Sequence, residues 1–305
     1  MESLKNELLK NRPNLSSGSI LTYSSVLRSL YFKLIGNKSM DHLGIFHQTA
    51  QVLESLKDEK INKKKTTLAA LFVLTGIQEY REDMLDTCKD YQKHIDSQEK
   101  TPSQVANWVT KEDVKNKLKE LKIIATPLLK KAQKTELSAA ELQLVQNYII
   151  LVLTGGLFFA PRRSLDWTEL KVSDIELINQ DKDNFIETIG KKQWFIFNTY
   201  KTAKTYSQQR VEIPATVKTI LKKWMTVIPP TCHYLLFDNH SNKLSSVTLN
   251  QRLNAIFGKK VGTSLLRHTY LSEKYGSTID TKKKLEKDMK AMGSSINISS
   301  TYILK

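Results

Sequence analysis

Four separated segments hold the side chains of this 305-residue chain that could act on a phosphodiester. They are TGGLFFAPRRSLDWTELKVSDI over 154–175, FIFNTYKTAKTYSQQRVEIP over 195–214, GTSLLRHTYLSEKY over 262–275 and MKAMGSSINISSTYILK over 289–305. In chain order they supply arginine, lysine, arginine and tyrosine. Arginine can hold phosphate oxygens, and lysine can protonate a leaving oxygen.

The first segment places Arg162 and Arg163 after a glycine pair and a proline, with Asp166 three residues beyond Arg163. An arginine on such a turn can reach out of the fold and bind a phosphate through two parallel hydrogen bonds. The nearby carboxylate would fix its orientation. A surface arginine that is simply paired with Asp166 is the structural alternative.

The second segment places Lys201 and Lys204 between two predicted strands. A lysine at the tip of a hairpin can enter a DNA groove and protonate a leaving oxygen. The alternative is a solvated lysine in a turn, without a chemical role.

The third and fourth segments supply Arg267, His268 and Tyr302. Arg267 and His268 fall within an apolar helical pattern, where a charge is costly unless it meets an opposite charge or a polar network. A phosphate-binding arginine satisfies that condition, and so does a buried structural pair with Asp or Glu. Tyr302 follows a Gly-Ser-Ser turn, and a tyrosine in such a place is otherwise a packing residue.

The charge balance of the chain is strongly basic, because 47 Lys+Arg against 31 Asp+Glu give 47 − 31 = +16. Such a chain favours an anionic partner, which could be nucleic acid, a membrane surface or an acidic protein. Its basic clusters are spread out, at 63–65, 130–131, 222–223, 259–260 and 282–284. The spread favours two domains that lie along a polyanion. The sequence has no long amphipathic stretch with an aromatic face, which argues against a membrane surface.

Other features of the composition exclude several classes of protein. Two cysteines are too few for a disulfide framework or a zinc cluster, and the six histidines show no metal-ligand spacing. Residues 1–10 lack a signal-peptide core, and the longest apolar window, 148–160, is too short to span a bilayer. We therefore expect an intracellular protein that uses no metal, no cofactor and no membrane partner.

The elements that position these residues are predicted to be mostly helices. Apolar residues at helical spacing predict helices over 20–34, 48–56, 66–78, 108–121, 138–153 and 217–224, and a long exposed helix over 80–100. Strands are predicted over 185–189, 194–198 and 210–213, with a tight turn at Gly190-Lys191 between the first two. The expected fold class is mainly α with a small antiparallel β-sheet.

Two predicted breaks divide the chain. One lies at 98–103 and contains Pro102, and the other runs from Pro127 to Lys134. We therefore expect a helical domain over 1–105, a linker over 106–134 and a second domain over 135–305.

The order and spacing of the four segments resemble the catalytic boxes of the tyrosine recombinases, also called phage-type integrases. The first box of that family reads Arg-x-x-Glu/Asp, with Asp-Ile eleven residues after the arginine. Arg163, Asp166 and Asp174-Ile175 match this box, and the register favours Arg163 over Arg162.

The lysine and the two remaining boxes of the family also have counterparts. The family's lysine lies in a β-hairpin, often before a threonine, and Lys201-Thr202 matches it. The second box usually reads His-x-Leu-Arg-His, and residues 264–268 match four of its five places. The nucleophile box usually reads Leu-Gly-His-Ser, then about eight residues to tyrosine. Residues 292–295 and Tyr302 are similar to it, with one residue fewer.

The resemblance is strong over residues 140 to 305, and its lettering is closest to recombinases of large DNA viruses, virophages and related mobile elements. It implies a catalytic domain that follows a helical core-binding domain. It also implies a site-specific recombinase or integrase that cleaves and rejoins double-stranded DNA, without metal or ATP, through a 3′-phosphotyrosyl link. The expected assembly is a homo-tetramer on DNA, acting where DNA lies in the cell.

The roles of single residues follow from the same resemblance. It implies Tyr302 as the nucleophile, Arg163 and Arg267 as holders of the transition-state charge, and Lys201 as the general acid. The supporting positions are Asp166, His268, Arg162 and Lys204.

The resemblance implies two further catalytic positions, Ser264 and Ser294, where the sequence departs from the family, because the family has histidine at both. Serine can donate a hydrogen bond to phosphate, but it cannot act as a base near neutral pH. His268 does not replace them, because its equivalent in the family is usually structural. Only three residues follow Tyr302, so we do not expect the C-terminal helix that many relatives exchange between subunits.

Two other functions remain open at this point. A type IB topoisomerase or a telomere resolvase would use the same chemistry for another purpose. A DNA-binding protein with a degenerate recombinase domain would use none of it, and the two serines are the reason to consider this alternative.

Overall fold

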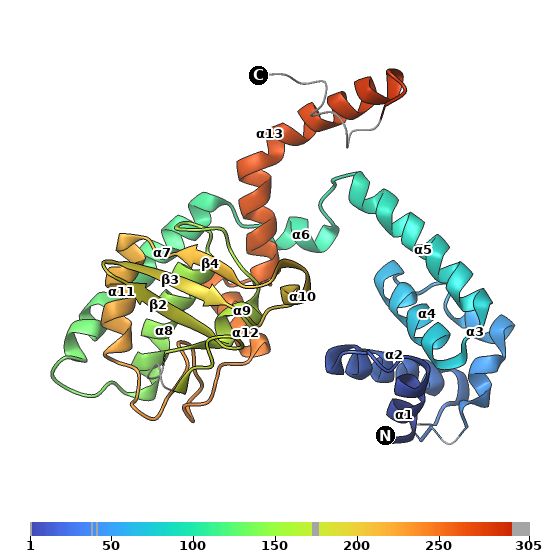
Figure 1. The fold of residues 1–305 in the computed structure, drawn as a ribbon, viewed down its shortest axis with the longest axis horizontal. Coiled ribbons are helices and arrows are strands. Elements are labelled where there is room, and N and C mark those ends of the chain that lie inside the picture. The colour runs from blue at the N-terminus through green and yellow to red at the C-terminus, as the bar shows by residue number, and fades with distance from the viewer. Residues whose placement is uncertain (1, 38, 41, 173–176, 295–305) are drawn as a thin grey trace. The chain divides into compact units, whose positions relative to one another are not determined.

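The computed structural model describes residues 2–37, 39–40, 42–172 and 177–294 (Figure 1). The chain divides into two compact units, Met1–Lys100 and Thr101–Lys305. Each unit has its own cluster of buried apolar side chains.

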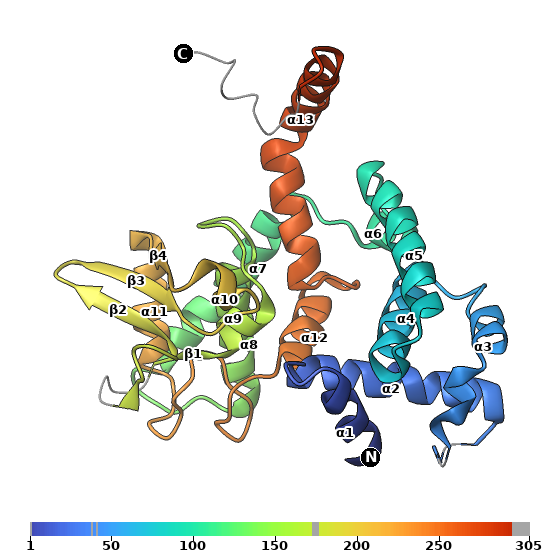
Figure 2. The same cartoon turned by 45° about the vertical axis from the view of Figure 1, so that its right-hand side comes forward.

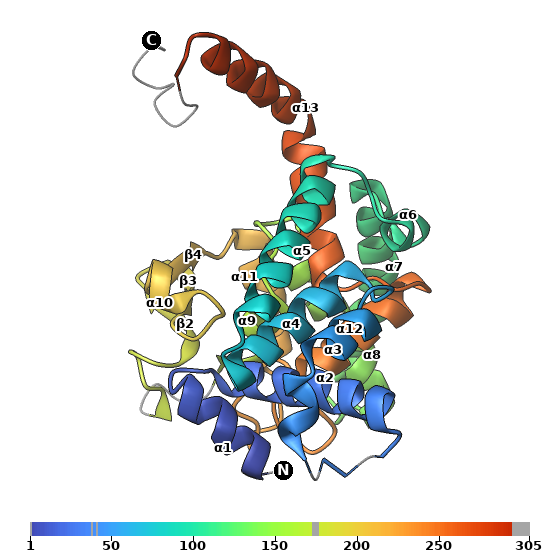
Figure 3. The same ribbon diagram turned by 90° about the vertical axis from the view of Figure 1, so that its right-hand side faces the viewer.

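The first unit is entirely helical within its described residues. Its elements are α1 (Glu2–Asn11), α2 (Ser17–Ile35), the short 3-10 helix η1 (Leu43–His47), α3 (Thr49–Ser55), α4 (Ile61–Thr75) and α5 (Gln78–Asp96). Helix α4 is the centre of this unit, because it packs against α1, α2 and α5, and Figure 3 shows α4 and α5 side by side. Ser16 caps α2 with its side chain, and Gly36 ends that helix at φ 76°.

The second unit begins with α6 (Pro102–Asn107), α7 (Lys111–Lys131) and α8 (Ala139–Thr154). The expected linker over 106–134 is mostly helix α7, which contributes Val114 and Ala125 to the second core. The predicted break at Pro127 is wrong, because α7 continues through it. A proline inside a helix costs about 3 kcal/mol, and the packing of α7 against α8 offsets that cost.

The sheet of the second unit has four strands in the order β1-β2-β3-β4. They are β1 (Leu170–Lys171), β2 (Asn184–Ile189), β3 (Lys192–Phe197) and β4 (Gln209–Glu212). The β2–β4 pairs are antiparallel, and the β2–β3 turn contains Gly190 at φ 57°. The antiparallel strands that the sequence predicts are present, and the sheet is mixed because β1 also pairs with β2 in parallel. Two residues are too few to produce a strand pattern in the sequence.

The remaining helices are α9 (Ser164–Thr168), α10 (Ala203–Tyr206), α11 (Ala215–Met225), α12 (Ser246–Phe257) and α13 (Thr263–Ala291). The core surrounds α8, in which every side chain from Tyr148 to Thr154 is buried. Trp167 joins this core to the sheet, with its ring centroid 5.1 Å from that of Phe195 and 5.4 Å from that of Phe197. Figure 2 shows that α13 begins beside α12 and extends away from the sheet.

The fold is therefore mainly helical with a small mixed sheet, and the predicted helical class is confirmed. Within the described ranges, no helix combines the length and the apolarity needed to cross a membrane.

Candidate functional site

The loop that carries the arginines leaves α8 at Gly155 and reaches α9 at Arg163. A side chain at Gly155 would bring its Cβ to 2.7 Å from the carbonyl oxygen of Leu151, and Gly156 adopts φ 72° with a virtual Cβ 3.0 Å from the ring of Tyr270. The two glycines are needed because the loop passes this close to α8 and α13. Arg163 then stands at the N-cap of α9 with extended backbone, at φ −71° and ψ 156°.

Arg162 is held firmly by its neighbours. Its Nε donates to Oδ2 of Asp166 at 2.8 Å, and its Nη1 donates to Oε1 of Gln209 at 2.6 Å. The guanidinium also lies 3.9 Å from the centroid of the Phe197 ring. These contacts join the arginine loop to α9 and to strand β4. They identify Arg162 as the arginine that is paired with Asp166. For Arg162, this is the structural ion pair that the sequence offered as the alternative to phosphate binding.

Arg163 and Arg267 come together from distant parts of the chain. Burial lowers the pKa of Arg267, the positive charge of Arg163 lowers it further, and the carboxylate of Asp166 acts in the opposite direction. The backbones that carry the two groups are close, because the hydroxyl group of Ser164, the residue after Arg163, lies 2.8 Å from that of Thr263, one helical turn before Arg267. Both arginine side chains are half-buried, and neither forms a hydrogen bond or ion pair with a described residue. Two half-buried positive charges without direct partners create a place that favours an anion.

Asp166 lies beneath these cations and is only 2% exposed. Burial raises the pKa of its carboxyl group, and the charges of Arg162, Arg163 and Arg267 offset part of that effect. Its Oδ1 has no hydrogen-bond partner among the described residues. One carboxylate thus stands against three guanidinium groups, and the local charge remains positive.

The predicted lysines lie in the connection between β3 and β4. Lys201 is exposed in the turn that precedes α10, and Lys204 is exposed within α10. The connection is therefore a turn of helix, while the sequence indicated a bare hairpin tip. Among the described residues, no hydrogen bond joins the segment 201–204 to Arg163 or Arg267. Gln209, the first residue of β4, accepts a hydrogen bond from Arg162. The end of the β3–β4 connection therefore lies next to Arg162.

The remaining predicted residues lie on or after α13. Ser264 is exposed and stands three residues before Arg267, so the two share one face of the helix. His268 is also exposed. Ser294 follows the end of α13, and its N–H donates to the carbonyl oxygen of Met289 at 2.8 Å. Tyr302, together with Asp174-Ile175 of the first box, lies outside the described residues.

Sequence reasoning missed three polar residues next to the arginines, which are Ser164, Asn250 and Thr263. The hydroxyl oxygens of Ser164 and Thr263 lie 2.8 Å apart, and the backbone N–H of Thr263 donates to Oδ1 of Asn250 at 3.0 Å. No local pattern marks them, because the three positions are far apart in the sequence and meet only in the fold.

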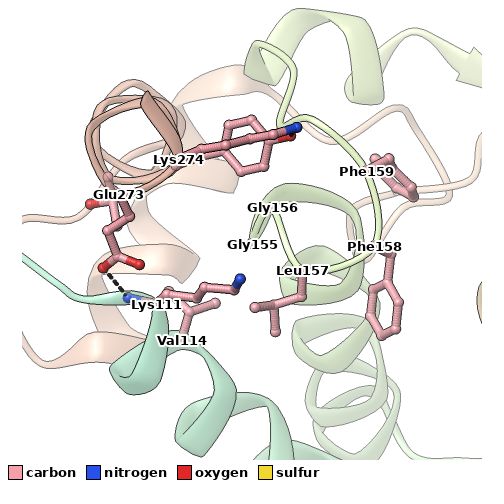
Figure 4. Close-up of a pocket in the computed structure, with 11 residues that line it drawn as sticks. Lys111, Val114, Gly155, Gly156, Leu157, Phe158, Phe159, Glu273 and Lys274 are labelled. Carbon is pink, nitrogen blue, oxygen red and sulfur yellow. Dashed lines mark hydrogen bonds between the residues drawn. The ribbon is translucent and has the colours of Figure 1, made fainter. Parts of the chain in front are cut away.

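A cavity of about 360 Å³ adjoins the arginine loop (Figure 4). The loop over 155–159 forms one wall, and Lys111 of α7 with Glu273 and Lys274 of α13 lies opposite. Glu273 accepts a hydrogen bond at 2.7 Å from the backbone N–H of Lys111, which fastens α7 to α13. No group of three or more His, Cys, Asp or Glu side chains gathers as a metal site among the residues with described positions.

Comparisons with known proteins give no sequence match: no protein-family model fits the chain, and no curated protein matches it. Solved structures do show similarity. The chain is similar to the XerH site-specific recombinase, crystallised with its difH substrate as a pre-cleavage complex, at a TM-score of 0.43 and 15% identity, over 90% of this chain and 83% of that one. It is also similar to the XerA recombinase, at a TM-score of 0.31 and 13% identity, over 89% and 83%. These identities are low, so residue roles have to be argued from the geometry of this chain.

Proposed function

We propose that this chain is a DNA breaking-and-rejoining enzyme of the tyrosine recombinase type, acting as a site-specific recombinase or integrase. The juxtaposition of Arg163 and Arg267, whose elements are joined by the 2.8 Å hydrogen bond between Ser164 and Thr263, carries the proposal. Two half-buried guanidinium groups near one carboxylate suit a phosphate ligand. The order of the four sequence segments and the net charge of +16 support DNA as the source of that phosphate.

In the proposed reaction the phenolic oxygen of Tyr302 attacks a phosphorus atom of DNA and gives its proton to solvent water. A 3′-phosphotyrosyl bond forms, and the bond from phosphorus to the 5′-oxygen breaks. Lys201 gives a proton to the leaving 5′-oxygen as the general acid. Attack by the 5′-hydroxyl of another strand reverses these steps and rejoins the DNA. The phosphotyrosyl bond stores the bond energy, so no nucleotide cofactor is needed.

The two arginines would act on the transition state. Negative charge grows on the non-bridging oxygens as phosphorus becomes five-coordinate, and Arg163 with Arg267 forms a positive site before the reaction begins. The like charges of Arg163 and Arg267 oppose each other, so a bound phosphate would offset their repulsion. Ser264, on the same face of α13 as Arg267, would donate a hydrogen bond to the phosphate.

The proposed partner is double-stranded DNA, on which the chain assembles as a homo-tetramer within the cell. The lettering of the four boxes supports an origin in a large DNA virus, a virophage or a related mobile element. Asp166 and Arg162 would support the site by holding α9 to β4. Lys204 is the alternative general acid, and His268 would have a supporting role.

A suicide substrate, in which the cleaved DNA end diffuses away, tests the proposal. The unaltered protein should form a covalent DNA adduct, whereas Tyr302→Phe should form none and still bind DNA. Tyr270→Phe and Tyr275→Phe are the matched controls and should keep the adduct.

Three results would revise the proposal. An adduct that survives in Tyr302→Phe moves the nucleophile elsewhere. Absence of any adduct with the unaltered protein supports a DNA-binding protein with a degenerate domain. Relaxation of supercoiled DNA without a specific site supports a type IB topoisomerase.

A further inference from the structure

Ser164, Asn250 and Thr263 form a small polar network between α9 and α13. The hydroxyl groups of Ser164 and Thr263 are 2.8 Å apart, and Nδ2 of Asn250 donates to Oγ of Ser164 at 3.2 Å. Asn250 also accepts from the N–H of Thr263 at 3.0 Å and donates to the carbonyl oxygen of Ser246 at 2.9 Å. Ser164 and Thr263 are only 6% and 4% exposed, so water does not compete strongly for these bonds.

The network lies directly next to the two arginines. Ser164 follows Arg163 in the chain, and Thr263 stands one helical turn before Arg267. Each hydroxyl group is therefore fixed within a few bonds of the backbone that carries a guanidinium group. The Ser164–Thr263 hydrogen bond is the direct polar link between the start of α9 and the start of α13.

Asn250 also completes the start of α13. The N-cap of that helix is Gly262, which has no side chain to accept a hydrogen bond from the first turn. Asn250 supplies the missing acceptor from α12, at the N–H of Thr263. A Cβ on Gly262 would lie 2.9 Å from Oδ1 of Asn250, so glycine leaves the space that this asparagine occupies.

A restraint at this place has an electrostatic reason. Arg163 lowers the pKa of Arg267 because their charges repel. Without a bound anion the two groups would move apart unless the backbone on each side were tied. The apolar side chains of Leu265 and Leu266 keep α13 in the core, and directional hydrogen bonds set its finer position.

We propose that Asn250 is a positioning residue, which acts through Ser164 and Thr263 to hold Arg163 and Arg267 at the separation that one phosphate requires. This inference rests on the proposed function, because it assigns the network to the reaction that the two arginines serve. A displacement of about 1 Å in such a site lowers rates about 100-fold.

Single-turnover adduct formation at saturating DNA, measured together with the Kd for DNA, tests this role. Asn250→Ala and Thr263→Val should each lower the rate constant about 10- to 100-fold, with little change in Kd. Thr263→Ser keeps the hydroxyl group and should restore the rate. Gln251→Ala changes an exposed residue next to Asn250 and is the matched control. Thermal unfolding shows whether each variant folds. If Asn250→Ala does not fold, the comparison of Thr263→Val with Thr263→Ser still tests the proposal.

A second measurement separates this proposal from the proposed function. Inorganic phosphate should raise the midpoint of thermal unfolding of the unaltered protein, since it binds the folded state. Arg163→Ala, Asn250→Ala and Thr263→Val should all weaken this effect, and Gln251→Ala should not. If no adduct forms but this pattern holds, the recombinase proposal fails and the positioning role stands. Unchanged rates, equal losses of rate and affinity, or failure of Thr263→Ser to restore the rate would overturn the positioning role.

Discussion

Two adjacent arginines have different surroundings in this protein. Arg162 is stacked on Phe197 and bonded to Asp166 and Gln209, so its guanidinium group has little freedom. Arg163 has no such direct contacts with described residues and lies beside another cation. The first environment suits a structural role, and the second suits a ligand that arrives from outside.

Substitution of each arginine should therefore give opposite results. Arg162→Ala leaves the buried carboxylate of Asp166 without its partner and should lower the free energy of unfolding by about 3–5 kcal/mol. Arg163→Ala removes a repulsion and should leave the thermal midpoint unchanged or slightly higher, while it slows adduct formation by about 10²–10³. Chemical denaturation and single-turnover cleavage measure the two effects. A large loss of stability in Arg163→Ala would contradict the division of roles.

The sequence predicts this site in part. The box spacing selects Arg163 and Arg267, and the structure brings their charges together. The sequence does not show that Arg162 binds the carboxylate of Asp166, because this pairing depends on Phe197 and Gln209 from distant strands. Non-local contacts of this kind leave no periodic signal.

At the scale of elements, helix α8 starts with a capping box. The side chain of Ser138 accepts from the N–H of Glu141, and the side chain of Glu141 accepts from the N–H of Ser138. The ammonium group of Lys131 at 2.7 Å, followed by the hydrogen bonds of Ser138, lowers the pKa of Glu141 from 4.5 to about 2. This contact also joins the end of α7 to the start of α8.

The stability given by Glu141 should depend on pH in a defined direction. A carboxyl group whose pKa is lower in the folded state stabilises the fold above its unfolded pKa and loses this effect as pH falls towards the folded pKa. Glu141→Gln should thus lower the thermal midpoint at pH 7, and the difference should shrink between pH 4.5 and about 2. Glu136→Gln, at an exposed glutamate before the same helix, is the control. A difference that stays constant with pH would contradict the assignment.

Capping residues made several elements predictable. Thr110 and Ser138 cap α7 and α8, each in a capping box with the residue three positions later, and such a local interaction can be recognised in a sequence. The path of α7 through Pro127 was not predictable, since it depends on how Ala125 and Leu129 pack in the core. Strand β1 was missed for a similar reason, because only its pairing with β2 defines it.

At the scale of the whole molecule, two units with separate cores carry the excess of positive charge. The basic clusters at 63–65 and 282–284 belong to different units. This distribution suits a partner whose negative charge is repeated along its length.

The salt dependence of the DNA association constant should show whether both units neutralise DNA phosphates. The logarithm of the association constant should fall with the logarithm of salt concentration by about 0.9 for each phosphate neutralised. The fragment 101–305 contains a complete apolar core and should fold alone. The slope of log K against log salt should be smaller for this fragment than for the full chain. Fluorescence anisotropy from about 50 to 200 mM salt measures both slopes. Equal slopes would mean that the first unit does not neutralise DNA phosphates.

The complete burial of the C-terminal half of α8, from Tyr148 to Thr154, has a consequence for the variation that this protein can tolerate. From Tyr148 to Thr154 no side chain faces solvent, so every substitution there changes the volume of the interior. The arginine loop begins where this helix ends and thus has an immobile anchor at one end. Substitutions that alter the position of Arg163 are therefore expected to occur in the loop over 155–161. The sequence of the buried half of α8 is expected to vary less.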